Sequence, residues 1–144
     1  MTRIDFYILA NLSGEQARAR FSCRLAEKAW QQGYRVFIHT VSQFAAQQVD
    51  ELLWTFRPES FLPHGLASEP ESAGLPVLVG SGAEPEPTLD LLINLSDTVP
   101  AYYQRFPRLA EIVESTDTAR EIARGRYRYY RDHGCTLRSH NLNL

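Results

Sequence analysis

The sequence predicts an α/β fold, namely a single three-layer α/β/α domain with a mostly parallel, mixed central sheet. Short apolar runs typical of buried strands recur at residues 4–9, 34–40, 76–80 and 91–95. The first two runs flank a segment with helical spacing of apolar residues, and this order predicts parallel pairing of the two strands with a right-handed crossover. The 144 residues are 44% hydrophobic and show no internal repeat, so one domain spanning residues 1–144 is expected.

The helices of the first half are marked by their expected ends. Ser13 and Gln16 form a capping-box pattern, which predicts a helix from there to about residue 32. Gly33 is the expected residue just past its C-terminus. A second helix is expected over residues 42–56, and the Arg57-Pro58 pair ends it. Residues 59–65 then read as a loop with an apolar centre.

The second half contains weaker signals. Residues 80–88 read as an acidic, proline-containing loop, and residues 96–106 as a short helix or turn. Residues 109–113 favour a strand, although a helix is possible. Asp117 or Thr118 is expected to cap a last helix, and the segment after Gly134 is polar and expected to be partly ordered.

Motifs for catalysis, cofactors and metals are missing from the sequence. No GxxxxGK[ST] or GxGxxG phosphate loop follows a predicted strand, and no GxSxG elbow occurs. Cys23 and Cys135 stand apart, and the four histidines lack metal-site spacing. A non-enzyme without cofactor or metal is therefore favoured. With no apolar run of about 18 residues and no signal-peptide pattern, a cytoplasmic location is expected.

Charge is distributed unevenly along the chain. Residues 1–119 carry nine basic and fifteen acidic side chains, a formal charge of −6. Residues 120–144 carry six arginines and two acids, a formal charge of +4. A mildly acidic protein that gathers its arginines in one segment presents a surface suited to an anionic partner.

Helical spacing would place most of these arginines on a single face of a helix. In a helix over residues 118–133, five side chains fall within an arc of about 100°. Guanidinium groups grip carboxylate or phosphate with two parallel bonds, and tyrosine adds an apolar ring with a hydroxyl. A solvated helix face and a surface for single-stranded nucleic acid are alternatives. The basic face comprises Arg120, Arg124, Tyr127, Arg128 and Arg131, and the expected core face comprises Ala119, Ile122, Ala123, Tyr129 and Tyr130.

An apolar cluster follows the second predicted helix. Leu53-Trp54-Thr55-Phe56 is closely followed by Phe61-Leu62-Pro63. Core packing explains part of this cluster, whereas an exposed Phe-Pro segment beside a tryptophan has the composition of an interface anchor.

Several segments, taken in order, resemble the chi subunit family of bacterial DNA polymerase III. The resemblance extends from end to end at similar length, and the segment 58–64 is its most specific part. The matching segments are Asp5-Phe6-Tyr7, Trp30 with Gly33-Tyr34-Arg35-Val36, Leu52-Leu53-Trp54, Pro58-Glu59-Ser60-Phe61-Leu62-Pro63-His64, Leu92-Ile93-Asn94-Leu95-Ser96, and residues 123–131 (ARGRYRYYR).

The resemblance implies a non-catalytic accessory subunit of the clamp loader with two protein partners. One is the acidic C-terminal tail of single-stranded DNA-binding protein, which ends in Pro-Phe with a free carboxylate. The other is the psi subunit, and DNA is contacted only indirectly. The tail-binding positions fall on Arg120, Arg124, Tyr127 and Arg128. The psi-binding positions fall on Trp54, Phe61, Leu62 and Pro63.

The chain departs from the family pattern in the last helix, where Gly125 replaces a common acidic residue and arginines replace possible lysines at 120 and 128. Two alternatives stay open. One is a module that binds single-stranded nucleic acid directly through the C-terminal Arg/Tyr helix. The other is an enzyme for a small anionic substrate, with His39 or Asn94 lining a crevice at the strand ends.

Overall fold

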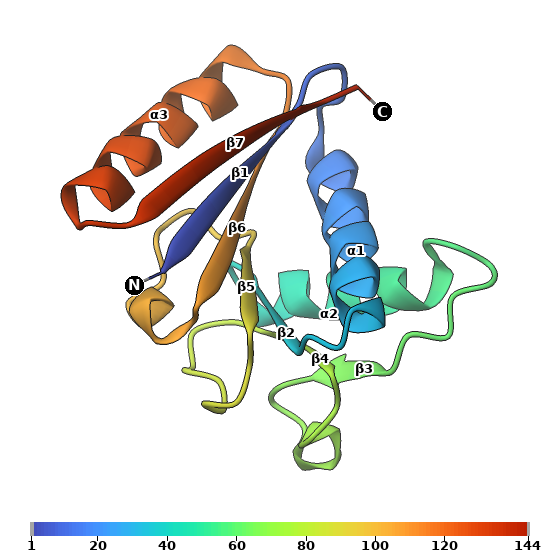
Figure 1. The fold of residues 1–144 in the computed structure, drawn as a ribbon. Coiled ribbons are helices and arrows are strands. Elements are labelled where there is room, and N and C mark those ends of the chain that lie inside the picture. The colour runs from blue at the N-terminus through green and yellow to red at the C-terminus, as the bar shows by residue number, and fades with distance from the viewer. Residues whose placement is uncertain (1, 144) are drawn as a thin grey trace.

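A seven-stranded sheet forms the centre of the protein, which confirms the α/β class (Figure 1). The computed structural model describes residues 2–143. The strand order is β3-β4-β2-β5-β6-β1-β7, and every recorded strand pair is parallel rather than mixed. The strands are β1 (Arg3–Leu9), β2 (Val36–His39), β3 (His64–Leu66), β4 (Val77–Gly80), β5 (Leu91–Asn94), β6 (Arg108–Val113) and β7 (Thr136–Leu142).

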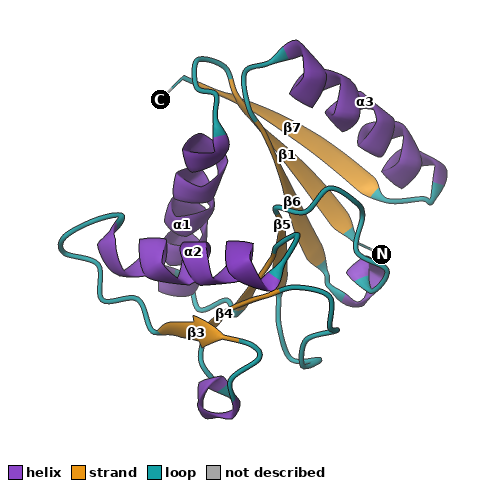
Figure 2. Ribbon diagram, turned by 180° about the vertical axis from the view of Figure 1, so that it is seen from behind, coloured by secondary structure: helices purple, strands orange, loops and turns teal. Residues whose placement is uncertain are grey.

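Helices cover both faces of this sheet (Figure 2). Helices α1 (Glu15–Gln31) and α2 (Gln43–Thr55) lie on one face, and α3 (Asp117–Asp132) lies on the other near β7 and β1. Single 3-10 turns occur at Pro70–Ser72 and Tyr103–Arg105. The three-layer architecture expected from the sequence is therefore present.

Alternation along β1 divides its side chains between two cores. Ile4 and Phe6 pack against α3 together with Tyr130, whereas Leu9 packs on the side of α1 and α2. Successive side chains of a strand point to opposite faces, so one strand supplies both layers. Cys23 is fully buried in the α1 side, and burial raises the pKa of its thiol to about 12.

The first strand–helix–strand unit is parallel, as expected, but its two strands do not pair with each other. β5 and β6 lie between β1 and β2 in the sheet. The helix ends at the expected place, because Gly33 has a φ of 88° and its N–H bonds to the Trp30 carbonyl at 2.9 Å.

The predicted cap of α1 is wrong. Gly14, not Ser13, is the N-cap residue, and no side chain caps the helix locally. Instead the Gly14 N–H donates to the carboxylate of Glu114 at 2.6 Å, a partner 100 residues away. A tertiary contact thus replaces the local capping box.

The predicted cap of α3 is off by one residue. Thr116 caps the helix, and its hydroxyl accepts the N–H of Ala119 at 3.1 Å. Asp117 and Thr118 lie inside the first turn. Asp117 is still favourable there because its negative charge sits at the positive end of the helix dipole.

Two strands lie where the sequence predicted irregular structure. β3 begins within the loop expected at 59–65, and β7 occupies the polar C-terminal segment. The sequence of β7 shows little hydrophobic periodicity, because its two leucines face opposite sides of the sheet: Leu137 packs toward α3 and Leu142 toward α1. It pairs with β1 alone and forms an edge of the sheet.

The expected core face of α3 is only partly buried. Tyr130 is fully buried, whereas Ile122 is 52% exposed and Tyr129 is 40% exposed. Phe44, an apolar position of α2, is 68% exposed. Tyr130, Ala119 and Ala123 belong to the apolar cluster between α3 and the sheet, so fewer residues of the expected core face are packed there than predicted.

A buried carboxylate, Asp5, organises the charged side chains at one end of β1. It is 1% exposed and accepts hydrogen bonds from Arg3 at 3.2 Å and His140 at 2.9 Å. The guanidinium of Arg108 lies 3.6 Å away. Burial alone would raise the pKa of this carboxyl, but the His140 and Arg3 bonds outweigh burial and hold the pKa below its ordinary value of 3.8.

Replacing Asp5 by asparagine is expected to lower the free energy of unfolding at pH 7 by about 1–3 kcal/mol. Because the folded-state pKa is depressed, the carboxylate stabilises the fold above its unfolded pKa, and this contribution is lost as pH falls through the folded pKa. Urea unfolding between pH 7 and pH 2.5 measures it. The variant should lose less stability on acidification than the wild type, whereas the exposed Asp132→Asn control should follow the wild type.

Candidate functional site

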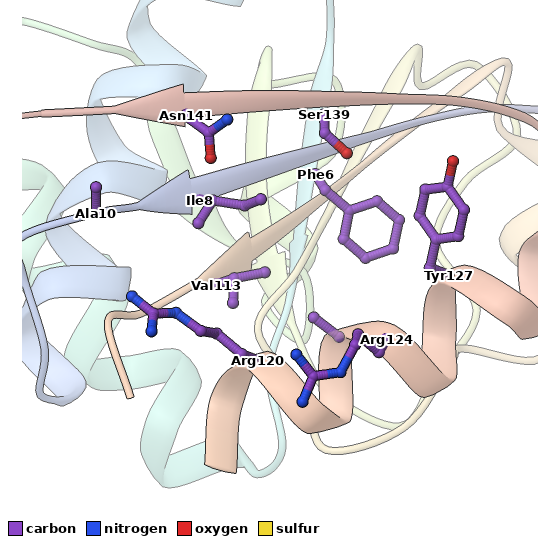
Figure 3. Close-up of a pocket in the computed structure, with 10 residues that line it drawn as sticks. Phe6, Ile8, Ala10, Val113, Arg120, Arg124, Tyr127, Ser139 and Asn141 are labelled. Atoms are coloured by element: carbon purple, nitrogen blue, oxygen red, sulfur yellow. The ribbon is translucent and has the colours of Figure 1, made fainter. Parts of the chain in front are cut away.

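A pocket of about 440 Å³ lies between α3 and the sheet face formed by β1, β6 and β7 (Figure 3). We call it the α3 pocket. Its volume lies within the range typical of small-ligand sites. It is lined by Phe6, Ile8, Ala10, Val113, Arg120, Ala123, Arg124, Tyr127, Ser139 and Asn141.

The inner wall of the α3 pocket is apolar. Phe6, Ile8 and Val113 come from alternate positions of parallel neighbours β1 and β6, so their side chains share the face that α3 covers. Ile8 pairs with Val113 in register, and Ala123 of α3 lies opposite them. The wall therefore suits an apolar group that leaves water.

Two guanidinium groups stand at the rim of the α3 pocket (Figure 3). Arg120 is partly engaged, because it donates to the Ser115 hydroxyl at 3.4 Å and lies 3.9 Å from the Asp117 carboxylate. Arg124 has no recorded ion pair or hydrogen bond within residues 2–143. Arg124 is thus a positive charge beside an apolar wall, and its guanidinium N–H groups can donate to an anionic ligand.

Tyr127 closes the pocket one turn after Arg124. Its ring lies 5.6 Å from the Phe6 ring, tilted by 45°, and the residue is 38% exposed. The tyrosine thereby holds an aromatic edge against the apolar wall while part of it faces solvent.

The structure brings three of the five residues of the predicted basic face to this pocket. Arg120, Arg124 and Tyr127 line it, but Arg128 and Arg131 do not. Arg128 is exposed on the next turn after Arg124. Arg131 lies 3.3 Å from the neighbouring Asp132 carboxylate.

Sequence reasoning missed the sheet half of the pocket. Phe6 and Ile8 read as ordinary buried strand residues, and Ser139 and Asn141 belong to the polar segment that forms β7. The alternation of β1 could have shown which of its residues share a face. No local pattern indicated that β7 would pair with β1.

A buried polar cluster fixes α3 on the sheet next to the pocket. Glu111 of β6 is 2% exposed and accepts from Arg126 at 2.7 Å and from the Tyr130 hydroxyl at 2.6 Å. Asn94 donates to the same carboxylate at 3.0 Å. Burial, followed by the Glu111 carboxylate, raises the pKa of Tyr130, so its hydroxyl keeps its proton and donates.

Arg126 and Tyr130 set the rotation of α3 through these bonds. Around the helix axis they lie to one side of the positions that line the α3 pocket, so when they contact Glu111 the helix directs Arg124 and Tyr127 toward the pocket. The cluster therefore positions the pocket residues without lining the α3 pocket itself.

Comparison with known proteins adds an independent result. A model of the family described as DNA polymerase III chi subunit, HolC, matches residues 1–138. The chain belongs to this family.

Individual members of the chi family match almost the whole chain. The chain is 42% identical to DNA polymerase III subunit chi of Pseudomonas aeruginosa, over 99% of this chain and 98% of the relative. It is 32% identical to the proteins of the same name from Escherichia coli and Haemophilus influenzae, with 95–96% of each chain covered. The family resemblance expected from the sequence is confirmed.

A second exposed surface of this chi-family chain lies at the end of α2. Phe61 is 85% exposed and Trp54 is 65% exposed, with the Trp54 ring 4.5 Å from the buried His64 ring. Pro63 is also exposed. Leu62 is 2% exposed and packs in the α1-side core, so it holds the segment in place and is not part of the exposed surface.

The matched pair Phe61→Ala and Leu62→Ala should separate these roles. Leu62→Ala is expected to lower the free energy of unfolding by about 2–5 kcal/mol, because it leaves a core cavity. Phe61→Ala should change it by less than about 0.5 kcal/mol, because the ring packs little in the isolated protein. Urea unfolding measures both, and a large loss in Phe61→Ala would show that the ring has a structural role.

The polar groups proposed for an enzymatic crevice are engaged in structure. The His39 ring nitrogen Nδ1 lies 2.7 Å from the Tyr102 hydroxyl, and burial lowers the His39 pKa. Asn94 donates to both Glu111 and the Thr98 carbonyl. One ring nitrogen of His39 and the amide of Asn94 thus have partners within the protein.

Within residues 2–143, no cluster of three or more His, Cys, Asp or Glu side chains is arranged to hold a metal ion. The helices of the same region include none with the length and apolarity needed to cross a bilayer.

Proposed function

We propose that this protein is a non-catalytic accessory subunit of the DNA polymerase III holoenzyme that acts in DNA replication. In this proposal it binds the acidic C-terminal tail of single-stranded DNA-binding protein and, through psi, links that protein to the clamp loader. Membership of the chi family supports the assignment to the polymerase. The observation that carries the tail-binding proposal is an apolar pocket with the uncompensated Arg124 at its rim.

The end of such a tail is chemically complementary to the α3 pocket. A terminal Phe ring would pack against Phe6, Ile8 and Val113, and burying a Phe side chain contributes about 1.5–3 kcal/mol. Its free carboxylate would accept bonds from Arg124. Such charge-assisted hydrogen bonds contribute about 1.5–3 kcal/mol each.

The acidic residues that precede the terminus would meet the remaining basic side chains. Arg128 is exposed one turn from Arg124, and Arg120 stands at the other end of the rim. Exposed charges of this kind speed the encounter and lose effect in salt, because interactions between exposed groups are screened. After ordering costs, a dissociation constant on the order of micromolar is expected, near −8 kcal/mol.

The psi subunit would use the second surface. Trp54, Phe61 and Pro63 give an exposed aromatic and proline-containing patch, and aromatic anchors commonly dominate protein interfaces. This patch lies on the α2 side of the sheet, and the α3 pocket lies on the opposite side.

Calorimetry with a short acidic peptide ending in Pro-Phe tests the tail-binding proposal. The free-acid peptide should bind with a micromolar dissociation constant, and its C-terminal amide should bind at least tenfold more weakly because Arg124 loses its charged acceptor. Equal affinity of acid and amide would contradict the proposal. Competition by oligo-dT for the peptide would instead favour nucleic-acid binding by α3.

A further inference from the structure

A second groove lies on the α1 side of the sheet, away from the α3 pocket. It has a volume of about 550 Å³ and lies between the C-terminal half of α1 and strands β1, β5 and β6. We call it the α1 groove. Its side chains include Arg24 and Lys28 of α1, Tyr7 of β1, Arg108 of β6, and Phe21 and Tyr34.

The charged side chains of the α1 groove are mostly basic and largely uncompensated. Arg24 and Lys28 are exposed and have no ion pair recorded within the described part of the chain. Arg108 lies 3.6 Å from Asp5, and its buried Nε has no hydrogen-bond partner. The acid in the groove wall, Asp90, already accepts the Arg35 backbone N–H at 2.8 Å.

Aromatic rings lie among these cations. Tyr34 is 40% exposed, and the Arg108 guanidinium lies 5.9 Å from its ring centroid. The Tyr7 ring lies 5.4 Å from Phe21 and stacks on His140 at 4.9 Å. Flat apolar surfaces are thus interleaved with fixed positive charge, which is the combination that accepts a base together with its phosphate.

We propose that the α1 groove binds a segment of single-stranded nucleic acid. A base would lie against Tyr34, which is partly exposed, and the adjoining phosphates would contact Arg24, Lys28 and Arg108. The volume is in the range of sites for small organic ligands, so the groove accommodates about one nucleotide at a time.

The walls of the α1 groove favour a nucleotide over an extended peptide. β1, β5 and β6 each pair with a neighbour on both sides, so their backbone groups are already bonded. A peptide adding to these three strands would find no free edge for its own N–H and C=O groups; the free sheet edge on β7 borders the groove only at Leu142. A nucleotide needs only ring faces and cations from side chains.

Further cations continue the same sheet face beyond the groove. Arg3 reaches Asp5, and Arg138 of β7 is in register with Asp5. Side chains in register on parallel neighbours share a face, so Arg138 lies on the α1 side. A strand leaving the α1 groove would pass these two arginines, and its binding would not require the α3 pocket.

Fluorescence anisotropy with a labelled 20-nucleotide oligo-dT at low salt tests this site. The double variant Arg24→Gln/Lys28→Gln is expected to bind about tenfold more weakly than the wild type, and the slope of log K against log salt should fall by about 0.7 for each lost phosphate contact. Both side chains are exposed, so the fold should persist, and circular dichroism checks this.

Arg124→Ala is the matched control, since it removes one cation from the opposite face. It should bind oligo-dT as the wild type does. Loss of oligo-dT binding in Arg124→Ala, with the double variant unaffected, would overturn the proposal and assign nucleic acid to α3. The peptide titration has the opposite dependence, so the groove and the tail-binding proposal can fail separately.

Lys28 is the only lysine of the chain and gives a second, direct measurement. Its acetylation by an amine-reactive reagent can be followed by mass spectrometry with and without ligand. Oligo-dT should slow the modification at least threefold, and the acidic Pro-Phe peptide should not. Equal protection by thymidine monophosphate would assign the groove to free nucleotides, and protection by the peptide alone would assign it to protein; either result overturns the proposal.

Discussion

Replacing Arg124 by alanine is expected to weaken binding of an acidic peptide ending in Pro-Phe by about 100-fold, or about 2.7 kcal/mol. Arg124 lines the α3 pocket beside its apolar wall, and it has no competing partner within residues 2–143. The variant therefore loses charge-assisted bonds to the terminal carboxylate. Calorimetry measures the affinity, and urea unfolding should show that stability changes by less than about 0.5 kcal/mol.

Arg131→Ala is the matched control for this prediction. It removes the same charge from the same helix, but Arg131 lies outside the α3 pocket beside Asp132. Its peptide affinity should drop less than about threefold, since exposed charges at a distance are screened. Unchanged affinity in Arg124→Ala, or equal losses in the two variants, would contradict the assignment of the terminal carboxylate to Arg124.

Replacing Arg126 by methionine is expected to lower the free energy of unfolding by about 3–5 kcal/mol. The Glu111 side chain is only 3% exposed and that of Arg126 only 13%, so removing the guanidinium leaves a buried carboxylate without its counter-ion. Urea unfolding at pH 7 measures the loss. Because the same contact orients α3, peptide affinity should also fall in the fraction that stays folded.

Two further variants show whether the loss comes from the uncompensated charge. Tyr130→Phe removes one hydrogen bond to Glu111 and keeps the ring, so it should cost about 1–3 kcal/mol. The double variant Glu111→Gln/Arg126→Met should be more stable than Arg126→Met alone, because no buried charge is left. If the double variant were less stable than the single one, packing by Arg126 rather than charge would account for the effect.

The helical half of the α3 pocket could be predicted from the sequence, and the sheet half could not. Arg120, Arg124 and Tyr127 follow from spacing of three and four residues, which is a local property of a helix. Ser139 and Asn141 reach the pocket because β7 pairs with β1 across more than 130 residues. Nothing in a short polar segment encodes so distant a partner.

The same distinction explains the errors at the helix ends. Ser42 caps α2 as a purely local rule predicts, with its side chain accepting the Ala45 N–H. The rule failed at Ser13, because Glu114 from the end of the sheet satisfies the Gly14 N–H. A local sequence pattern predicts a helix end correctly when nearby side chains supply the capping hydrogen bonds. It fails when a side chain that is distant in the sequence supplies them instead.

Helices α2 and α3 lie on opposite faces of one sheet, and this keeps the two exposed surfaces described above apart. A ligand in the α3 pocket and a partner on Trp54 and Phe61 would be separated by the full thickness of the sheet, so neither would block the other. Their binding free energies should add, and two contacts that are weak alone would hold their partners at a raised local concentration. Either partner could therefore dissociate from the protein while the other stays bound.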